Sequence, residues 1–317
     1  MAQTHLLTFE NELDDAAKSS LKTAVSELNF DQLNRYFTRA MEHSNAATAL
    51  DPAKMTPIDT EMTNLNASEE QSQKWRQIGL DNVKSGKVGV LLLAGGQGTR
   101  LGMPLPKGCL SIKSLSNKSL FQLQFERIQK VEKMGGGEIP LYIMTSPATY
   151  DATFSFLSEN NYFGLKSSQV KIFNQGLLPC FSKTGDIMLG TKSSLATAPD
   201  GNGGLWKAVR SSGSLDDMIA RGLKQIHMYC VDNCLTNVAD PEFLGFAWEK
   251  ESDCGAKCVL KTEPHESVGV VCKYDGEPRV VEYSEISKEL AESRRDDGGL
   301  TFDAGNICNH YRDYLKI

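Results

Sequence analysis

The feature that most constrains the fold is an alternation of short apolar runs with amphipathic stretches, which begins at Val88. Apolar runs cover 88–93, 140–146 and 225–231, and apolar residues at helical spacing cover 119–134, 148–159, 214–222 and 240–251. This alternation predicts an α/β protein with a mostly parallel sheet and helices on both faces. Three strand-like segments then follow in a row, "AKCVLK", "SVGVVCKY" and "RVVEYSE". They indicate a mixed sheet or an added β element.

The part of the chain before this alternation has a different pattern. Apolar residues recur at helical spacing over 6–43, which predicts one or two amphipathic helices. Residues 44–67 are small, polar and interrupted by proline, so they are expected to form a linker or a surface loop. Ser68 and Gln71 match a capping box for a helix that ends near Lys84. We therefore expect a helical N-terminal segment and linker over 1–84 and an α/β domain over 85–317.

Composition narrows the classes of function. The chain has 317 residues, of which 40% are hydrophobic, enough for a sizeable core. A net charge of −6 argues against nucleic acid as the main partner. The first residues lack the apolar run of a signal peptide, and no stretch approaches the roughly 20 apolar residues that span a membrane. We expect a cytoplasmic protein, with no membrane partner, whose eight cysteines are free thiols.

Two cysteine pairs have a spacing that could bind zinc. Cys230 with Cys234 and Cys254 with Cys258 each form a CxxxC pattern. However, Cys230 ends the apolar run "IHMYC" and Cys258 lies within "AKCVLK". Because free cysteine is a common small buried hydrophobe, we favour a packing role over a metal site.

A glycine-rich stretch, "LLLAGGQGTRLGMPLPKG", follows the first apolar run and occupies 91–108. It contains no P-loop, because no glycine stands before Lys-Ser or Lys-Thr in the required frame. The dinucleotide pattern GxGxxG begins at Gly96 and Gly98 but meets Leu101 where the third glycine should be. A third pattern, LxxGxGTRLxxxxPK of the sugar-nucleotide pyrophosphorylases, is matched in full from Leu93 to Lys107. The simpler alternative is a strand-to-helix turn with solvated cations.

The residues of this stretch are suited to bind a nucleoside triphosphate. Glycines let the backbone turn tightly and approach a ligand closely, and their N–H groups can point at phosphate oxygens. Arg100 and Lys107 would add two cations, and Pro106 fixes the backbone before the lysine.

The chain resembles the eukaryotic UDP-N-acetylglucosamine pyrophosphorylases, also called UDP-N-acetylhexosamine pyrophosphorylases. The resemblance continues beyond the glycine-rich stretch and covers about residues 85–310. It is carried by the segments "APDGNGG", "YCVDN", "GAKCVLKTEPHESVGVV", "VVEYSEIS" and "FDAGNICNH". It implies a Rossmann-like nucleotidyltransferase domain with a mixed, mostly parallel sheet.

The resemblance also implies a reaction. Members of this family make UDP-N-acetylglucosamine and pyrophosphate from UTP and N-acetylglucosamine-1-phosphate with Mg2+. The sugar phosphate would attack the α-phosphate of UTP in line. A phosphate dianion needs no general base, so catalysis would come from positioning and from charge neutralisation. Arg100 and Lys107 are the expected catalytic residues. N-acetylgalactosamine-1-phosphate is the second candidate substrate, and a UDP-glucose pyrophosphorylase is a more distant alternative.

Matching positions then give the expected binding residues. Leu93, Ala94, Gly95, Gly96 and Lys107 would contact the nucleotide, Gln175 and Gly201 the uracil, Asn202 the sugar, Asp232 the Mg2+, and Gly269, Glu282 and Asn306 the acetamido sugar. Each also has a simpler alternative. Asn202 would fit a turn between glycines, Glu282 a surface carboxylate on an edge strand, and Asp232 the start of a loop.

The sequence departs from the family pattern at two places. The chain stops at Ile317, whereas family members continue with at least two further substrate-contacting lysines and a C-terminal domain. Asp303 also stands where asparagine is expected. Residues 85–317 would then be a C-terminally truncated catalytic domain. The alternative to a working transferase is a nucleotide-binding fragment or isoform without useful turnover; a dehydrogenase is a third, distant possibility.

Overall fold

The computed structural model describes residues 3–44, 50–98, 105–113 and 115–313. The chain forms two compact units, one made of Met1–Leu50 with Gly176–Asn202 and the other of Asp51–Gln175 with Gly203–Ile317. This division differs from the boundary expected at residue 84. Residues 51–84 belong to the larger unit because their long helix packs along another helix of that unit.

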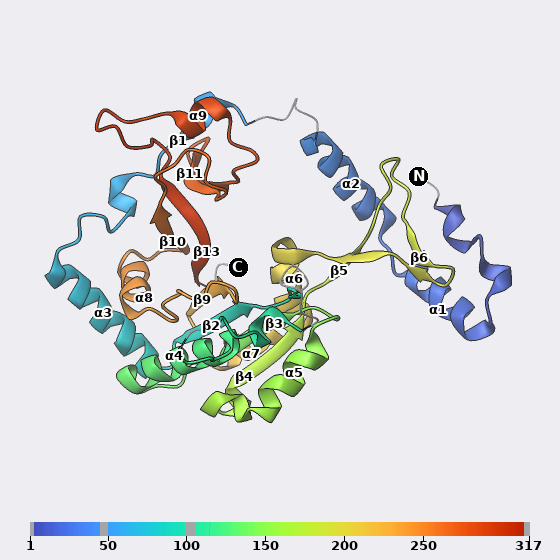
Figure 1. Cartoon of the computed structure of the whole chain (residues 1–317), viewed down its shortest axis with the longest axis horizontal. Coiled ribbons are helices and arrows are strands. Elements are labelled where there is room, and N and C mark those ends of the chain that lie inside the picture. Colours follow the sequence, from blue (N-terminus) through green and yellow to red (C-terminus); the bar gives the residue numbers. More distant parts are fainter. Residues whose placement is uncertain (1–2, 45–49, 99–104, 114, 314–317) are drawn as a thin grey trace. The chain divides into compact units, whose positions relative to one another are not determined.

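A mixed nine-stranded sheet forms the centre of the larger unit (Figure 1). Its strands are β1 Met55–Thr56, β2 Val88–Leu93, β3 Leu141–Thr145, β4 Val170–Asn174, β9 Gln225–Cys230, β10 Cys254–Leu260, β11 Val270–Tyr274, β12 Glu277–Val281 and β13 Ala304–Asp313. The order is β1-β11-β13-β9-β2-β3-β4, with β10 beside β13 and β12 beside β11. Strands β9, β2, β3 and β4 are parallel, and the remaining pairs are antiparallel. The expected mixed sheet is confirmed.

Helices cover both faces of the parallel part. They are α3 Glu69–Lys84, α4 Leu120–Gly135, α5 Tyr150–Glu159, α6 Leu205–Ser211, α7 Ser214–Ala220 and α8 Pro241–Glu249; the short helix α9 Lys288–Glu292 lies apart from them, near β1 and β11 (Figure 1). Val90 and Leu92 of β2 point into a core with α3, α4, α5 and α8. Leu91 and Leu93 point into a second core with α6 and α7. Successive side chains of β2 thus serve opposite faces, as the unbroken apolar run of a buried parallel strand requires.

The stretch expected to be a linker contains ordered elements. Strand β1 pairs antiparallel with β11 and buries Met55. Helix α3 begins as predicted, because the Ser68 hydroxyl accepts a hydrogen bond from the Gln71 N–H at 3.2 Å. The linker prediction was wrong for residues 55–56, since a two-residue strand is too short to stand out by periodicity.

The smaller unit combines two helices with two short hairpins. Its elements are α1 Asp15–Ser26, α2 Phe30–Ser44, β5 Leu177–Pro179, β6 Leu189–Thr191, β7 Ser194–Leu195 and β8 Thr197–Pro199. The two helices confirm the amphipathic pattern of 6–43. Leu6, Leu33 and Ile187 form the buried centre of this unit.

Short 3-10 turns occupy several connections. They are η1 Thr4–Leu7, η2 Glu10–Glu12, η4 Pro52–Lys54, η5 Thr60–Met62, η7 Lys107–Cys109, η8 Asn161–Gly164, η9 Ser167–Gln169 and η10 Gly201–Gly204.

Among the described helices, none combines the length and the apolar character that a membrane span requires.

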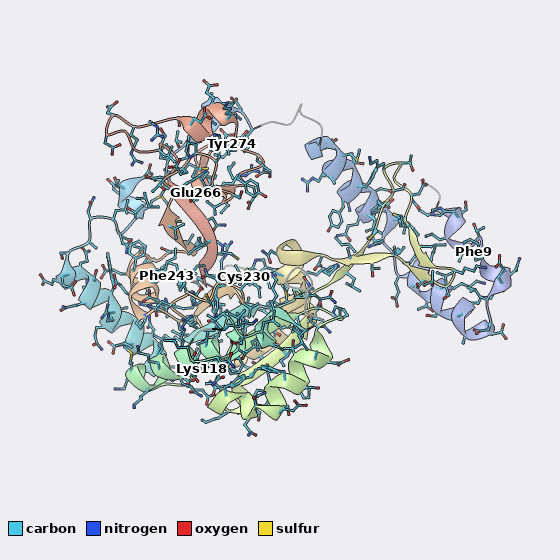
Figure 2. All side chains as sticks on the ribbon, in the orientation of Figure 1. Phe9, Lys118, Cys230, Phe243, Glu266 and Tyr274 are labelled. Atoms are coloured by element: carbon cyan, nitrogen blue, oxygen red, sulfur yellow. The ribbon has the colours of Figure 1, made fainter. Side chains whose placement is uncertain are left out.

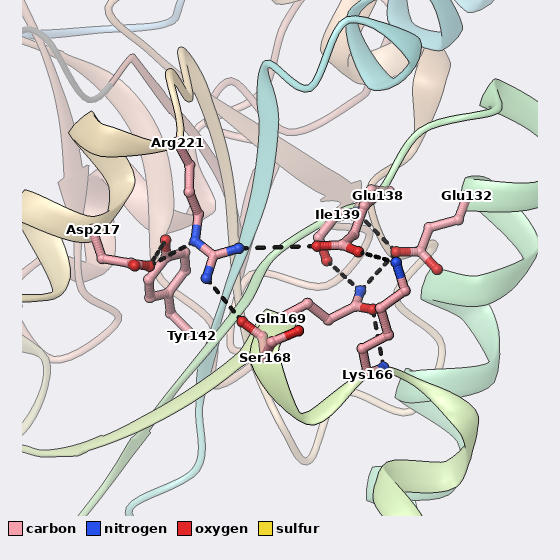
Figure 3. Close-up of polar contacts among 9 residues, drawn as sticks. All are labelled: Glu132, Glu138, Ile139, Tyr142, Lys166, Ser168, Gln169, Asp217 and Arg221. Carbon is pink, nitrogen blue, oxygen red and sulfur yellow. Dashed lines mark hydrogen bonds and ion pairs between the residues drawn. The ribbon is translucent and has the colours of Figure 1, made fainter.

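A polar network ties the elements before β3 and β4 together (Figure 3). The Gln169 amide donates to Glu132 Oε1 at 2.7 Å and to the Ile139 carbonyl at 3.0 Å. Lys166 Nζ lies 2.8 Å from Glu138 Oε2. These contacts fix the amino ends of both strands, which leaves the opposite edge of the sheet for the loops described next.

Candidate functional site

The candidate site lies where the strand order reverses. From β2 the chain moves through β3 to β4 on one side, and later returns to place β9 on the other side of β2. Leu93 is paired with Cys230 in this parallel register, so the loops that follow β2 and β9 leave the sheet together. In open α/β sheets such a reversal at the carboxyl ends of strands is the usual place for a ligand.

The glycine-rich turn begins directly after β2. Leu93 and Ala94 are buried, and the Ala94 N–H donates to the Met144 carbonyl at 2.8 Å. The chain then leaves the sheet, with Gly96 exposed. After the loop, the Lys107 N–H donates back to the Gly96 carbonyl at 3.2 Å. This return places the lysine side chain beside the glycine turn.

Gln175 packs against this turn from the end of β4. A Cβ placed on Gly95 would lie 2.5 Å from Gln175 Nε2, so the amide keeps this position only beside a glycine. The Gln175 side chain is 8% exposed, and its amide has no hydrogen-bond partner among the described residues. A nearly buried amide with free donor and acceptor atoms suits the recognition of a polar ring edge.

Lys107 and Asp232 bring opposite charges to the same edge. Lys107 Nζ lies 2.8 Å from Asp232 Oδ2, and the two side chains are 31% and 53% exposed. The ion pair is therefore open to solvent, so both groups can exchange partners at little cost. Lys107, Gly96 and Asp232 thus lie together at this end of the sheet.

A second group gathers at β11, β12 and β13. The Asn306 N–H donates to the Gly269 carbonyl at 2.8 Å. A Cβ on Gly269 would lie 3.1 Å from Glu282 Oε2, so the carboxylate faces this glycine. The three residues expected around the acetamido sugar are neighbours. Asp303, where asparagine was expected, has a local partner instead, since Arg295 Nη1 lies 2.6 Å from its Oδ2.

Three further residues were predicted to belong to the site. Gly201 and Asn202 belong to the smaller unit, where Gly201 has a left-handed backbone with φ of 61°. Asn202 is exposed in the short turn η10. Arg100, one of the two expected catalytic residues, lies outside the described residues.

Two cysteines that the sequence did not place in the site lie at its edge. The Cys230 thiol donates to Cys308 Sγ at 3.2 Å, which links the end of β9 to β13 (Figure 2 labels Cys230). This hydrogen bond lowers the pKa of Cys308 and raises the pKa of Cys230. No sequence signal pairs them, because 77 residues separate the two positions along the chain.

The zinc-like spacing finds no support in the geometry. All eight cysteines are free. A search of the described part of the chain finds no group of three His, Cys, Asp or Glu side chains that could hold a metal. Cys254 and Cys258 are both exposed on β10, so the buried packing role favoured for Cys258 was wrong. Beyond its pairing with β13, β10 leaves these side chains facing solvent.

A mixed α/β sheet with a glycine turn, a lysine and a carboxylate at the reversal of strand order defines an α/β protein of Rossmann-like architecture, with these groups where such folds usually hold their ligands. The chain belongs to the family described as UTP–glucose-1-phosphate uridylyltransferase, whose model matches residues 30–314.

Individual relatives show which members of this family the chain is similar to. The chain is 44% identical to the UDP-N-acetylhexosamine pyrophosphorylase-like protein 1 of Xenopus tropicalis over 98% of its length, and 44% identical to the UDP-N-acetylglucosamine pyrophosphorylase of Saccharomyces cerevisiae over 87%. It spans 63% and 59% of those two proteins. The solved UDP-N-acetylglucosamine pyrophosphorylase of Trypanosoma brucei, in complex with an inhibitor, matches with a TM-score of 0.84 at 29% identity, covering 98% of this chain and 64% of that one. The resemblance to eukaryotic UDP-N-acetylglucosamine pyrophosphorylases is confirmed.

Proposed function

We propose that the protein is a uridylyltransferase that forms UDP-N-acetylglucosamine and pyrophosphate from UTP and N-acetylglucosamine-1-phosphate. The observation that carries the proposal is the meeting of Gly96, Lys107 and Asp232 at the carboxyl ends of β2 and β9. The names of the relatives point to the same reaction. N-acetylgalactosamine-1-phosphate is the second candidate for the sugar substrate.

The glycine turn would hold the triphosphate. Backbone groups of residues 93–96 would line the nucleotide, and Lys107 would exchange its contact with Asp232 for a phosphate oxygen. Arg100 would add a second cation. The sugar phosphate would then attack the α-phosphate while these cations offset the charge on the departing pyrophosphate. The attacking dianion is already a nucleophile, so no side chain has to remove a proton.

Asp232 is the proposed residue for Mg2+. Its carboxylate is about half exposed and, among the described residues, contacts Lys107, so it has oxygen lone pairs available on the solvent side. This donor set fits Mg2+, which keeps several waters and often takes only one or two protein carboxylates together with phosphates. When bound, the ion would neutralise charge on the phosphates.

The uracil and the sugar would be read by separate groups. Gln175 has the free amide for the uracil, and we propose that Gly201 assists it and that Asn202 contacts the sugar. Gly269, Glu282 and Asn306 would receive the acetamido sugar. We also propose a cytoplasmic location, which the eight free thiols support.

The test is pyrophosphate release from UTP and N-acetylglucosamine-1-phosphate with Mg2+, using the full chain and two lysine variants. Lys107→Ala removes a cation from the site and should lower the rate by about a hundredfold or more. Lys166→Ala is the matched control, because its pair with Glu138 has the same 2.8 Å length but precedes β3 and β4 at the other edge of the sheet. The control should keep the wild-type rate.

Two results would contradict the proposal. Equal losses of rate in both variants would show that Lys107 affects the stability of the protein rather than the reaction at the site. UTP binding without turnover in the wild-type chain would favour the nucleotide-binding alternative. Rates with N-acetylgalactosamine-1-phosphate and glucose-1-phosphate, measured in parallel, identify the preferred sugar substrate.

A further inference from the structure

Cys230 and Cys308 form a thiol pair that the proposed reaction does not use. Their sulfur atoms lie 3.2 Å apart, and both residues are partly exposed. They lie just beyond the last paired residues of β9 and β13, Tyr229 and Asn309, in the antiparallel register of these strands. A disulfide requires a sulfur–sulfur distance of roughly 2 Å, so a movement of about 1 Å would join the two thiols.

An irregularity in β13 aims Cys308 at its partner. Opposite β10, the register jumps from Ala256–His310 to Cys258–Asn306, so three residues of β13 face a single residue of β10. Cys308 is the middle residue of this bulge and has a left-handed backbone with φ of 52°. The Asn306 side chain supports the turn by accepting the Cys308 N–H at 3.3 Å. Bulges next to functional sites commonly redirect one side chain in this way.

We propose that Cys230 and Cys308 are a reversible oxidation site, at which a peroxide joins β9 to β13 through a disulfide. The Cys308 sulfur attacks one oxygen of the peroxide, the O–O bond breaks, and a sulfenic acid and one water result. The Cys230 sulfur then attacks the sulfenic sulfur, the S–S bond forms, and a second water leaves with the Cys230 proton. Two thiols are oxidised by two electrons and one peroxide is reduced. A small-molecule dithiol reverses the step.

The bridge would act on the candidate site through short stretches of backbone. Asp232 lies two residues after Cys230, and Asn306 lies two residues before Cys308. The Asn233 amide already contacts the Ile307 carbonyl at 3.5 Å between the same two segments. Shortening the sulfur–sulfur distance to the roughly 2 Å of a disulfide pulls these segments together and shifts Asp232 relative to Lys107. The oxidised protein should therefore bind UTP more weakly, a consequence that rests on the proposed function; the bridge itself does not.

The test treats the full chain with hydrogen peroxide, digests it without reduction and identifies cross-linked peptides by mass spectrometry. We expect one bridged peptide pair that contains Cys230 and Cys308, with a mass lowered by two hydrogen atoms and restored by dithiothreitol. Cys308→Ser should abolish it. Cys234→Ser is the matched control, because Cys234 is the other thiol near Cys230, and it should leave the bridge intact. UTP affinity, measured by calorimetry, should fall about tenfold on oxidation and recover on reduction.

Other results overturn the proposal. A bridge between Cys230 and Cys234, or scattered oxidation without a bridge, would show that the pair has no special reactivity. A bridge that leaves UTP affinity unchanged would remove its link to the site. If the reduced protein fails to bind UTP, the proposed function is wrong. The presence or absence of the bridged peptide still tests whether Cys230 and Cys308 form a disulfide.

Discussion

At the scale of single residues, the glycine turn depends on an absent Cβ. Gln175 Nε2 lies 2.5 Å from the position that a Cβ on Gly95 would occupy, so any larger residue at 95 has to displace the end of this side chain. We predict that Gly95→Ala displaces the amide and weakens UTP binding by about tenfold, with a small effect on the free energy of unfolding. Calorimetric titration with UTP checks this. Gly255→Ala is the control, since its nearest neighbour, Phe243 Cε2, would lie 3.4 Å away in ordinary contact; equal losses in both variants would contradict the prediction.

His227 makes stability depend on pH. Its ring is buried, with Nδ1 accepting the Ala239 N–H at 2.9 Å and Nε2 at 2.7 Å from Asn309 Oδ1. Burial lowers the pKa of His227 to about 4, from 6.5. Below pH 6.5 the unfolded chain therefore takes up a proton that the folded chain does not, and stability falls as the pH drops toward 4.

This linkage has a size that can be measured. Between pH 7 and 5, protonation of His227 in the unfolded chain should remove about 2 kcal/mol from the free energy of unfolding. His227→Gln cannot titrate, so its urea-unfolding free energy should lose that much less over the same range. Parallel pH curves for the two proteins would exclude the histidine as the source.

At the scale of elements, α3 and α8 touch backbone to backbone. A Cβ on Gly79 would lie 2.0 Å from the Pro241 carbonyl oxygen, and one on Gly245 would lie 1.8 Å from the Trp75 carbonyl oxygen. The two helices each present a glycine to the other, which explains why residues 69–84 belong to the larger unit. Helix α3 could be predicted from the sequence, but its packing against α8 could not. A glycine in a helix permits a close approach but does not identify the segment that approaches.

We predict that Gly79→Ala forces the two helices apart and costs about 1–3 kcal/mol of stability, because no rotamer change can relieve a clash with backbone. Chemical denaturation measures the loss. Gly255→Ala again serves as the control and should stay within about 0.5–1 kcal/mol of wild type. A stable Gly79→Ala protein would mean that α3 can shift along α8 without penalty.

At the scale of the whole molecule, each unit is stabilised by its own buried residues, separate from those of the other. The smaller unit is discontinuous, since Leu6 and Leu33 meet Ile187 in its centre. We predict that Leu6→Ala leaves a cavity and raises hydrogen exchange both in 15–44 and in 177–199, while the amides of β2 and β9 keep their protection. Exchange that rises equally throughout the chain would show that the units unfold as one.

Much of the fold was fixed by periodicity alone. The apolar run of 88–93, the capped helix ending at Lys84 and the alternation through residue 251 all appear as strands and helices within a few residues of their expected bounds. In buried parallel strands and amphipathic helices, the local pattern of apolar residues shows which side chains are buried. These elements could therefore be predicted from the sequence. The pattern from Leu93 to Lys107 could also be recognised in the sequence, through its resemblance to the sugar-nucleotide pyrophosphorylases, and its role in binding phosphate stays a prediction.

Only the tertiary structure decided which distant residues meet. Strand β13 was not predicted, because "AGNICNHYRD" mixes polar and apolar residues around a bulge and becomes a strand through pairing with β9 and β10. That pairing, and no local pattern, brings Cys308 to Cys230 and Asn306 to Gly269. The sequence by itself determined the elements and the chemistry of the glycine turn, since both depend on neighbouring residues. The register between strands far apart in the chain depends on the packing of the whole unit, and so only the folded structure could settle it.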